Sequence, residues 1–91
     1  MTGTMKAQFV YEQRSFNDHA ITRQSAFGAY YSTTEVSIAK NGYTPVACSL
    51  TEWSNIKASV TPYIYNGKVG FLSDVSQTPT LLGVGILYRA N

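Results

Sequence analysis

The feature of this sequence that most constrains its fold is the pair Asn66-Gly67, set between two short runs of β-forming residues. Asn-Gly is the preferred pair for a two-residue type I′ turn, because both central residues need a positive φ. The sequence therefore predicts a β-hairpin over 60–73, in which Pro62 lies at an edge because proline has no N–H to donate to a ladder. Closing this turn gathers five residues on one face: Val60, Pro62, Ile64, Val69 and Phe71.

A second pair, Asn41-Gly42, separates two further runs of β-forming residues. The same turn preference predicts a second hairpin here, with 35–40 as its first strand and 43–50 as its second. Cys48 lies within the second run, where its small apolar side chain is expected to be buried and its thiol unreactive.

The last strand-like run, 81–88, carries apolar residues or glycine on both faces. A strand of this kind is covered on both sides. Gly83 and Gly85 lie within the run and indicate places where another part of the chain approaches the backbone closely. We therefore expect the run to lie inside a core or a subunit interface. The residues expected to be buried are Val84, Ile86 and Leu87.

The N-terminal run, 5–13, alternates with period two, which is typical of a half-buried strand. Ala7, Phe9 and Tyr11 share one face. Val10 interrupts the polar face, so we expect that face to be partly covered as well. The remaining expectations are a polar loop over 15–25 with a short strand near 20–23, a short strand over 27–32, and a short helical turn over 51–58.

Chain length and composition place these elements in one small domain. The 91 residues suit a single domain over 1–91, with Met5 as the expected native start. A domain of this size buries roughly 60–65% of its unfolded surface, and oligomerisation is one usual source of further stability. Cys48 and His19 are the only residues of their kinds, which argues against a disulfide framework and a zinc site. The sequence predicts a small antiparallel all-β sandwich without a cofactor.

Charged residues make up 13% of the chain, whereas about 25% is usual. The net charge is +2, and the basic residues are spread along the chain, so the basic stripe of a nucleic-acid binder is missing. No run approaches the ~18 consecutive apolar residues of a membrane span. Few charges and seven tyrosines fit a surface that contacts other subunits, sugars or another protein.

The sequence holds no recognisable catalytic constellation. Its five acidic residues fall in separate segments, so no spacing suggests a glycosidase pair. No elbow motif positions a serine nucleophile for use with Asp18 and His19. We therefore expect a protein that is not an enzyme.

Three segments of the second half together resemble one family. The run 39–47, which contains Gly42-Tyr43-Thr44-Pro45, resembles the GYTP segment near the C-termini of phage tail-fibre and baseplate receptor-binding proteins. The hairpin over 65–73 is similar to one that follows in those proteins, and 84–88 resembles their closing strand. The order and spacing of the three segments also agree, and the likeness covers 34–91.

This resemblance implies a β-sandwich head or tip domain that forms a homotrimer in the tail of a virion. Such domains commonly bind host-surface saccharides or lock the trimer at the fibre end, among other tail proteins, and they are not usually enzymes. The chain lacks the long repetitive shaft that precedes the head in this family. The alternative is another viral structural module, a capsid decoration or tail adaptor protein, with no ligand site.

Aromatic and polar residues in loops are the candidates for a saccharide site. Trp53 is expected either to stack on the apolar face of a sugar ring or to fill a position in the core or an interface. Tyr30 and Tyr31 are adjacent, so in a strand they point to opposite faces and one of them is available for a ligand or a partner. The candidate ligand residues are Trp53, Asp18, His19, Asn55 and Tyr31.

Subunit contacts are expected from two places in the sequence. One is the second face of the 60–73 hairpin, which carries two tyrosines, and the other is the final strand. The candidate interface residues are Tyr63, Tyr65, Val84, Ile86, Leu87 and Tyr88.

Overall fold

The computed structural model describes residues 6–25 and 28–91. The described chain consists of strands, bridges, turns and irregular segments, without a helix. The eight strands are β1 (Phe9–Asn17), β2 (Arg23–Gln24), β3 (Tyr31–Ser32), β4 (Val36–Ser37), β5 (Tyr43–Ser54), β6 (Val60–Tyr65), β7 (Lys68–Ser73) and β8 (Leu81–Ala90).

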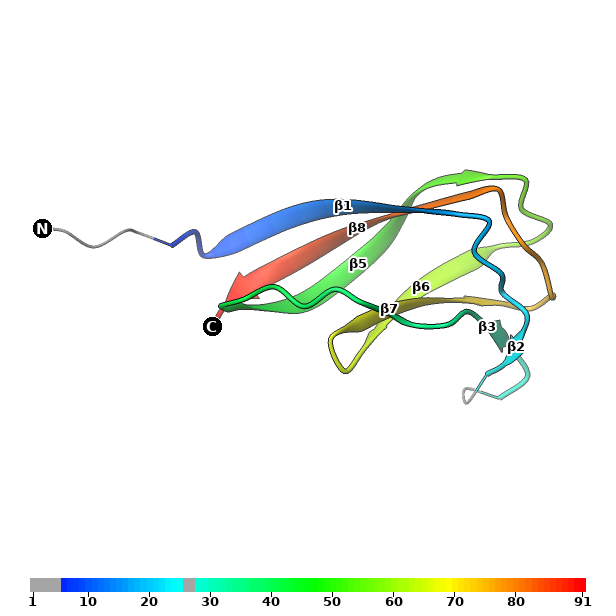
Figure 1. Cartoon of the computed structure of the whole chain (residues 1–91), viewed down its shortest axis with the longest axis horizontal. Helices are drawn as coiled ribbons and strands as arrows, with labels where there is room; N and C mark the ends of the chain where they lie inside the picture. The colour runs from blue at the N-terminus through cyan, green and yellow to red at the C-terminus, as the bar shows by residue number, and fades with distance from the viewer. Residues whose placement is uncertain (1–5, 26–27) are drawn as a thin grey trace, which may run out of the picture.

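These strands form two antiparallel sheets that lie one above the other in Figure 1. In the first sheet β8 lies between β1 and β5. In the second sheet the order is β2-β3-β7-β4, and β6 pairs with β7 as well. The all-β antiparallel architecture that the sequence predicts is confirmed.

The β6–β7 hairpin forms in the predicted register. Asn66 and Gly67 have φ values of 49° and 70°, as a type I′ turn requires. Ile64 lies opposite Val69, and Pro62 opposite Phe71. Within the described chain β6 pairs only with β7, so it is an edge strand, as the proline indicates.

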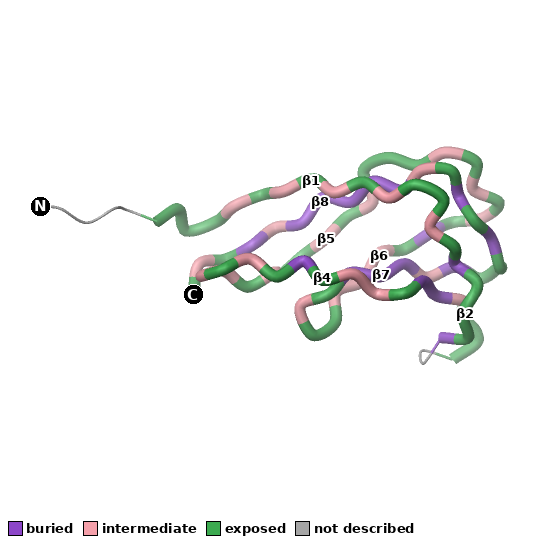
Figure 2. The backbone as a smooth tube through the Cα atoms, viewed as in Figure 1, coloured by how far each residue is buried: buried purple, intermediate pink, exposed green. Residues whose placement is uncertain are grey.

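The core lies between the two sheets, and β8 contributes most to it. Leu82, Val84 and Ile86 are fully buried on the inner face of the first sheet, and Val69 and Phe71 are fully buried on the second. Figure 2 shows the buried positions concentrated along β8 and β7. The buried final strand that the sequence predicts is confirmed, and it extends to Ala90.

Two parts of the prediction for β8 need correction. Val84, Ile86 and Tyr88 are buried within a single chain, so they belong to its core and are not available as interface residues. The Tyr88 hydroxyl donates a 2.6 Å hydrogen bond to the Ile38 carbonyl, which anchors the ring inside. Leu87 is only half-buried, because it lies on the outer face of the sheet with Tyr11 opposite.

The predicted second hairpin is wrong, although a turn does form at Asn41-Gly42. The Tyr43 N–H donates to the Lys40 carbonyl at 3.0 Å, and Gly42 has a φ of 82°. The flanking strands, however, belong to different sheets: β4 pairs with β7 and β5 pairs with β8. Asn41 does not have the positive φ that a type I′ turn needs, so this turn connects the two layers.

The predicted helical turn over 51–58 is also wrong. β5 continues through this region to Ser54, with Trp53 opposite Leu82. A register shift between Leu50 and Glu52 marks a β-bulge at Thr51, which bends the strand without ending it. The strand ends at Ser54, and the next residue, Asn55, has a φ of 57°.

β1 differs from the prediction in both its bounds and its orientation. It runs to Asn17, so the predicted loop over 15–25 begins three residues later. The covered face is the one that carries Val10 and Phe16, whereas Phe9 and Tyr11 are exposed. Tyr11 instead covers the outer face of β8, where its ring lies against Gly85.

The short predicted strands are found in part. Near 20–23 the chain forms an isolated bridge between Ile21 and Gln77, and β2 begins at Arg23. Of the strand predicted over 27–32, only β3 forms, and Phe27 lies outside the described residues.

Candidate ligand site

Trp53 lies near the end of β5, just beyond the bulge at Thr51. Its side chain is 55% exposed, which is unusual for an indole. A shallow hollow of about 290 Å³ lies beside it, lined by Thr51, Glu52, Trp53 and Leu81. The single chain therefore does not use Trp53 to fill its core.

Thr80 connects three chain segments near the end of β5. Its N–H donates to the Ser54 carbonyl at 3.0 Å, and its carbonyl accepts from the Asp18 N–H at 3.1 Å. The Asn55 amide donates to the Thr80 hydroxyl at 2.7 Å. Asp18 and Asn55 both have positive φ, so each turns the chain sharply at the end of its strand. We call Asp18, Trp53, Asn55 and Thr80 the Trp53 corner.

His19 is not free to take part in this corner. Its ring stacks on Phe16 with a centroid separation of 5.1 Å and meets Phe71 edge-on at 6.1 Å. Its Nε2 donates to the Thr34 carbonyl at 3.2 Å. These contacts give the imidazole a structural role against Phe16 and Phe71, and the ligand role of His19 stays a prediction.

Tyr31 is also separate from the corner. It lies in β3 of the second sheet and packs against the core, half-buried. Among the candidate ligand residues, Asn55 and Asp18 are both linked to Thr80 near the end of the strand that carries Trp53, whereas Tyr31 and His19 make other contacts.

Two tyrosines of β6 differ in their surroundings. Tyr65 is 54% exposed at the hairpin tip. Tyr63 is half-buried, and its hydroxyl donates a 2.7 Å hydrogen bond to Glu35 Oε2. Burial, reinforced by this bond, raises the pKa of Tyr63 far above its usual value.

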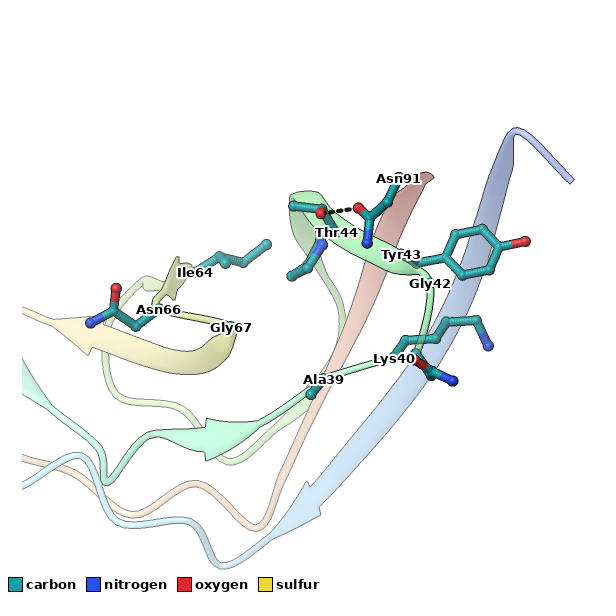
Figure 3. A pocket seen from close by; sticks show the side chains of 11 residues that line it. Ala39, Lys40, Gly42, Tyr43, Thr44, Ile64, Asn66, Gly67 and Asn91 are labelled. Carbon is teal, nitrogen blue, oxygen red and sulfur yellow. Dashed lines mark hydrogen bonds between the residues drawn. The ribbon is translucent and has the colours of Figure 1, made fainter. Parts of the chain in front are cut away.

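A larger hollow, the turn cleft, lies between the two Asn-Gly turns beside the C-terminal residue (Figure 3). Its volume is about 630 Å³. The Thr44 hydroxyl donates to Asn91 Oδ1 at one wall. Sequence reasoning missed this cleft, because the two turns come together only when β5 and β7 enter different sheets. The lining residues are 39–45, Ile64, Asn66, Gly67 and Asn91.

The charged side chain at the turn cleft is already engaged. Lys40 Nζ lies 2.7 Å from Glu12 Oε2 and 5.6 Å from the centre of the Tyr43 ring. The pair with Glu12 raises the pKa of Lys40 above its usual value. Figure 3 shows the Tyr43 ring directed away from the cleft, and its hydroxyl donates to the Ala7 carbonyl at 3.0 Å. The cleft therefore offers amides and small residues to a ligand, with no aromatic platform.

Groups that could hold a metal ion are not assembled among the described residues. No cluster of three or more His, Cys, Asp or Glu side chains lies there that is able to hold a metal ion. Cys48 is half-buried in β5, and burial raises the pKa of its thiol, which keeps it in the less reactive protonated form. The structure also has no helix, across its described ranges, of the length and apolar character needed to cross a membrane.

Comparisons with known proteins add no relative. No protein-family model matches the chain, and the searches found no similar curated protein and no similar solved structure.

Proposed function

We propose that this chain is a non-enzymatic tip domain of a phage tail fibre, which binds a host-surface saccharide at the Trp53 corner. One observation carries the proposal: the only tryptophan of the chain is 55% exposed, beside a shallow hollow that the polar side chains of Thr51 and Glu52 also line. The segments that resemble receptor-binding heads support the same assignment.

The corner offers the two kinds of surface that a sugar ring needs. An indole face covers the apolar C–H face of the ring. The Glu52 carboxylate, which is exposed and lines the hollow beside Trp53, is an acceptor for hydroxyl groups at the rim of the ring. A shallow site of this kind binds weakly, at about millimolar affinity, and a homotrimer strengthens attachment through multivalency.

Fluorescence of the unmodified protein tests the site, because Trp53 is its only tryptophan. We expect emission near that of indole in water and strong quenching by iodide. Polysaccharide prepared from the host cell wall should then reduce the quenching. Emission that is shifted to the blue and resists iodide would contradict the exposure on which the proposal depends.

Two variants locate the saccharide. Trp53→Ala should abolish retention of the protein on immobilised cell-wall polysaccharide. Tyr65→Ala is the matched control, since it removes an equally exposed aromatic side chain from the other sheet and should leave retention unchanged. Retention that survives Trp53→Ala would overturn the assignment of the site.

A further inference from the structure

The two outer edges of the three-stranded sheet differ in their ability to accept another strand. On β5, the Gly42 carbonyl accepts a 3.0 Å hydrogen bond from the Asn91 N–H. The backbone N–H and C=O groups of every second residue, counted from Gly42, therefore point toward β8. Pro45 falls at an outward-facing position, where it offers no N–H. Register shifts next to Pro45 and at Thr51 distort this edge further. These are the usual means by which proteins protect an edge strand.

The β1 edge carries neither a proline nor a bulge. Its nine residues pair with β8 in one unbroken register. The Gln8 carbonyl accepts from the Ala90 N–H at 2.8 Å, and the Asp18 N–H donates to the Thr80 carbonyl at 3.1 Å. The backbone N–H and C=O groups of the even-numbered residues therefore point toward β8. Within the described chain β1 pairs only with β8. The outward-facing backbone groups belong to Phe9, Tyr11, Gln13, Ser15 and Asn17.

We infer that β1 pairs antiparallel with β1 of a second copy, about a two-fold axis at Gln13. A long, straight edge strand with unpaired backbone groups is a template for such pairing. The contact would join two three-stranded sheets into one continuous sheet. This inference does not depend on the proposed saccharide site.

The side chains of β1 select this register. A ladder forms only in registers that place two residues with outward-pointing backbone groups opposite each other. With Gln13 opposite itself, Glu12 lies opposite the partner's Arg14, and Val10 lies opposite the partner's Phe16. Centring the pair on Glu12 or on Arg14 instead would place like charges directly opposite, which is unfavourable.

Both charged side chains have capacity left for this contact. Glu12 and Arg14 lie half-buried on the inner face of the sheet. Lys40 donates a hydrogen bond to Glu12 Oε2, which leaves Oε1 available as an acceptor. Arg14 uses Nη2 to donate to the Ser37 carbonyl at 3.1 Å, and its guanidinium has further N–H donors. In the joined sheet the two would occupy a non-hydrogen-bonded pair, where side chains approach most closely.

The molar mass of the whole chain in solution is the first test. Multi-angle light scattering at micromolar concentration should give an even number of chains, two by this contact alone or six if it joins two homotrimers. A mass of one chain or of three chains would overturn the edge contact, and a mass of three would still agree with a homotrimeric fibre tip.

A charge-swap series tests the register. Arg14→Glu would place carboxylates opposite each other, so we expect about a tenfold or larger weakening of the two-fold association. Adding Glu12→Arg to this variant should restore association, because opposite charges again face each other. Far-UV circular dichroism and thermal melting verify that each variant is folded. Equal association of the wild type and the single variant would contradict the register.

Two substitutions at Gln13 test the ladder itself. Gln13→Pro removes an outward-facing N–H at the two-fold axis and should reduce association strongly. Gln13→Ala removes the same side chain but keeps the N–H, so it should associate as the wild type does. Should the proline variant fail to fold, the charge-swap series still decides. Undiminished association of a folded Gln13→Pro protein would exclude β1 pairing.

Discussion

At the scale of single residues, the polar side chains that join distant segments around the second sheet have no signature in the sequence. Gln77 is buried, and its amide nitrogen donates to the Ser73 hydroxyl at 2.7 Å and to the Ala58 carbonyl at 3.2 Å. Tyr63 donates to Glu35 across a separation of 28 residues. Such bonds join segments that are distant in the chain, so no local sequence pattern predicts them.

The Tyr63 hydroxyl gives the fold a dependence on alkaline pH. Burial and the bond to Glu35 raise the pKa of Tyr63 in the folded chain, whereas an unfolded tyrosine ionises near pH 10. The stabilisation is complete below about pH 10 and is lost as the pH rises from there towards the folded pKa. We expect the melting temperature to fall above about pH 10, and Tyr63→Phe to make this fall shallower. Tyr88, Lys40 and Cys48, whose pKa values are also raised in the folded chain, contribute to the part of the fall that remains.

Melting curves recorded by circular dichroism at a series of pH values measure this effect. Tyr65→Phe is the control, because that tyrosine is exposed in the same strand and its loss should leave the fall unchanged. An identical fall in the Tyr63→Phe and wild-type proteins would show that the Tyr63 hydroxyl carries no such role.

At the scale of elements, local turn chemistry predicts a hairpin only when both flanking strands remain in one sheet. Asn66-Gly67 meets this condition, and its register follows from the sequence. Asn41-Gly42 has the same two residues, yet the residues after it pair with β8. Pairing across the sheet also overrides the helical spacing around Trp53, where the bulge at Thr51 lets β5 continue. The Trp53 corner is therefore predictable only in its residue types.

The glycines of β7 and β8 allow a matched comparison of aromatic coverage. A methyl group on Gly70 would come within 2.6 Å of the Tyr63 ring, which burial and Glu35 hold in place. A methyl group on Gly85 would overlap the Tyr11 hydroxyl, but Tyr11 is 58% exposed and is able to swing outward. We expect Gly70→Ala to lower the free energy of unfolding by about 1–3 kcal/mol, and Gly85→Ala by less than about 1 kcal/mol. Urea unfolding measures both, and equal losses would refute the difference in freedom between the two rings.

At the scale of the whole molecule, the two layers are joined by a core to which β8 contributes four buried side chains, Leu82, Val84, Ile86 and Tyr88. The all-β class and this buried strand are predictable, because a strand that is apolar on both faces has few other places to lie. Which face of β1 turns inward is not, since Phe9 and Tyr11 are more apolar than Glu12 and Arg14. The inward face also carries Val10 and Phe16, which pack against the core, and its two charged side chains find partners there: Lys40 pairs with Glu12, and the Ser37 carbonyl accepts from Arg14.

Ile86 and Leu87 are adjacent residues that test this core. Ile86→Asp places a carboxylate in the fully buried centre, at a cost of several kcal/mol, and we expect an unfolded or insoluble protein. Leu87→Asp changes the half-buried outer face and should leave a folded protein with a lowered melting temperature. Circular dichroism and solubility measure both, and a folded Ile86→Asp protein would place β8 outside the core.

Pro45 has a consequence for growth beyond a single contact. In polymer terms, a molecule with two reactive ends forms filaments, whereas one with a single reactive end stops at a pair. With its β5 side closed by Pro45 and the adjacent bulge, the three-stranded sheet is monofunctional. Pro45→Thr would restore a backbone N–H at this edge. The sheet would then have two edges able to pair, and one of the barriers to fibrous aggregation would be removed.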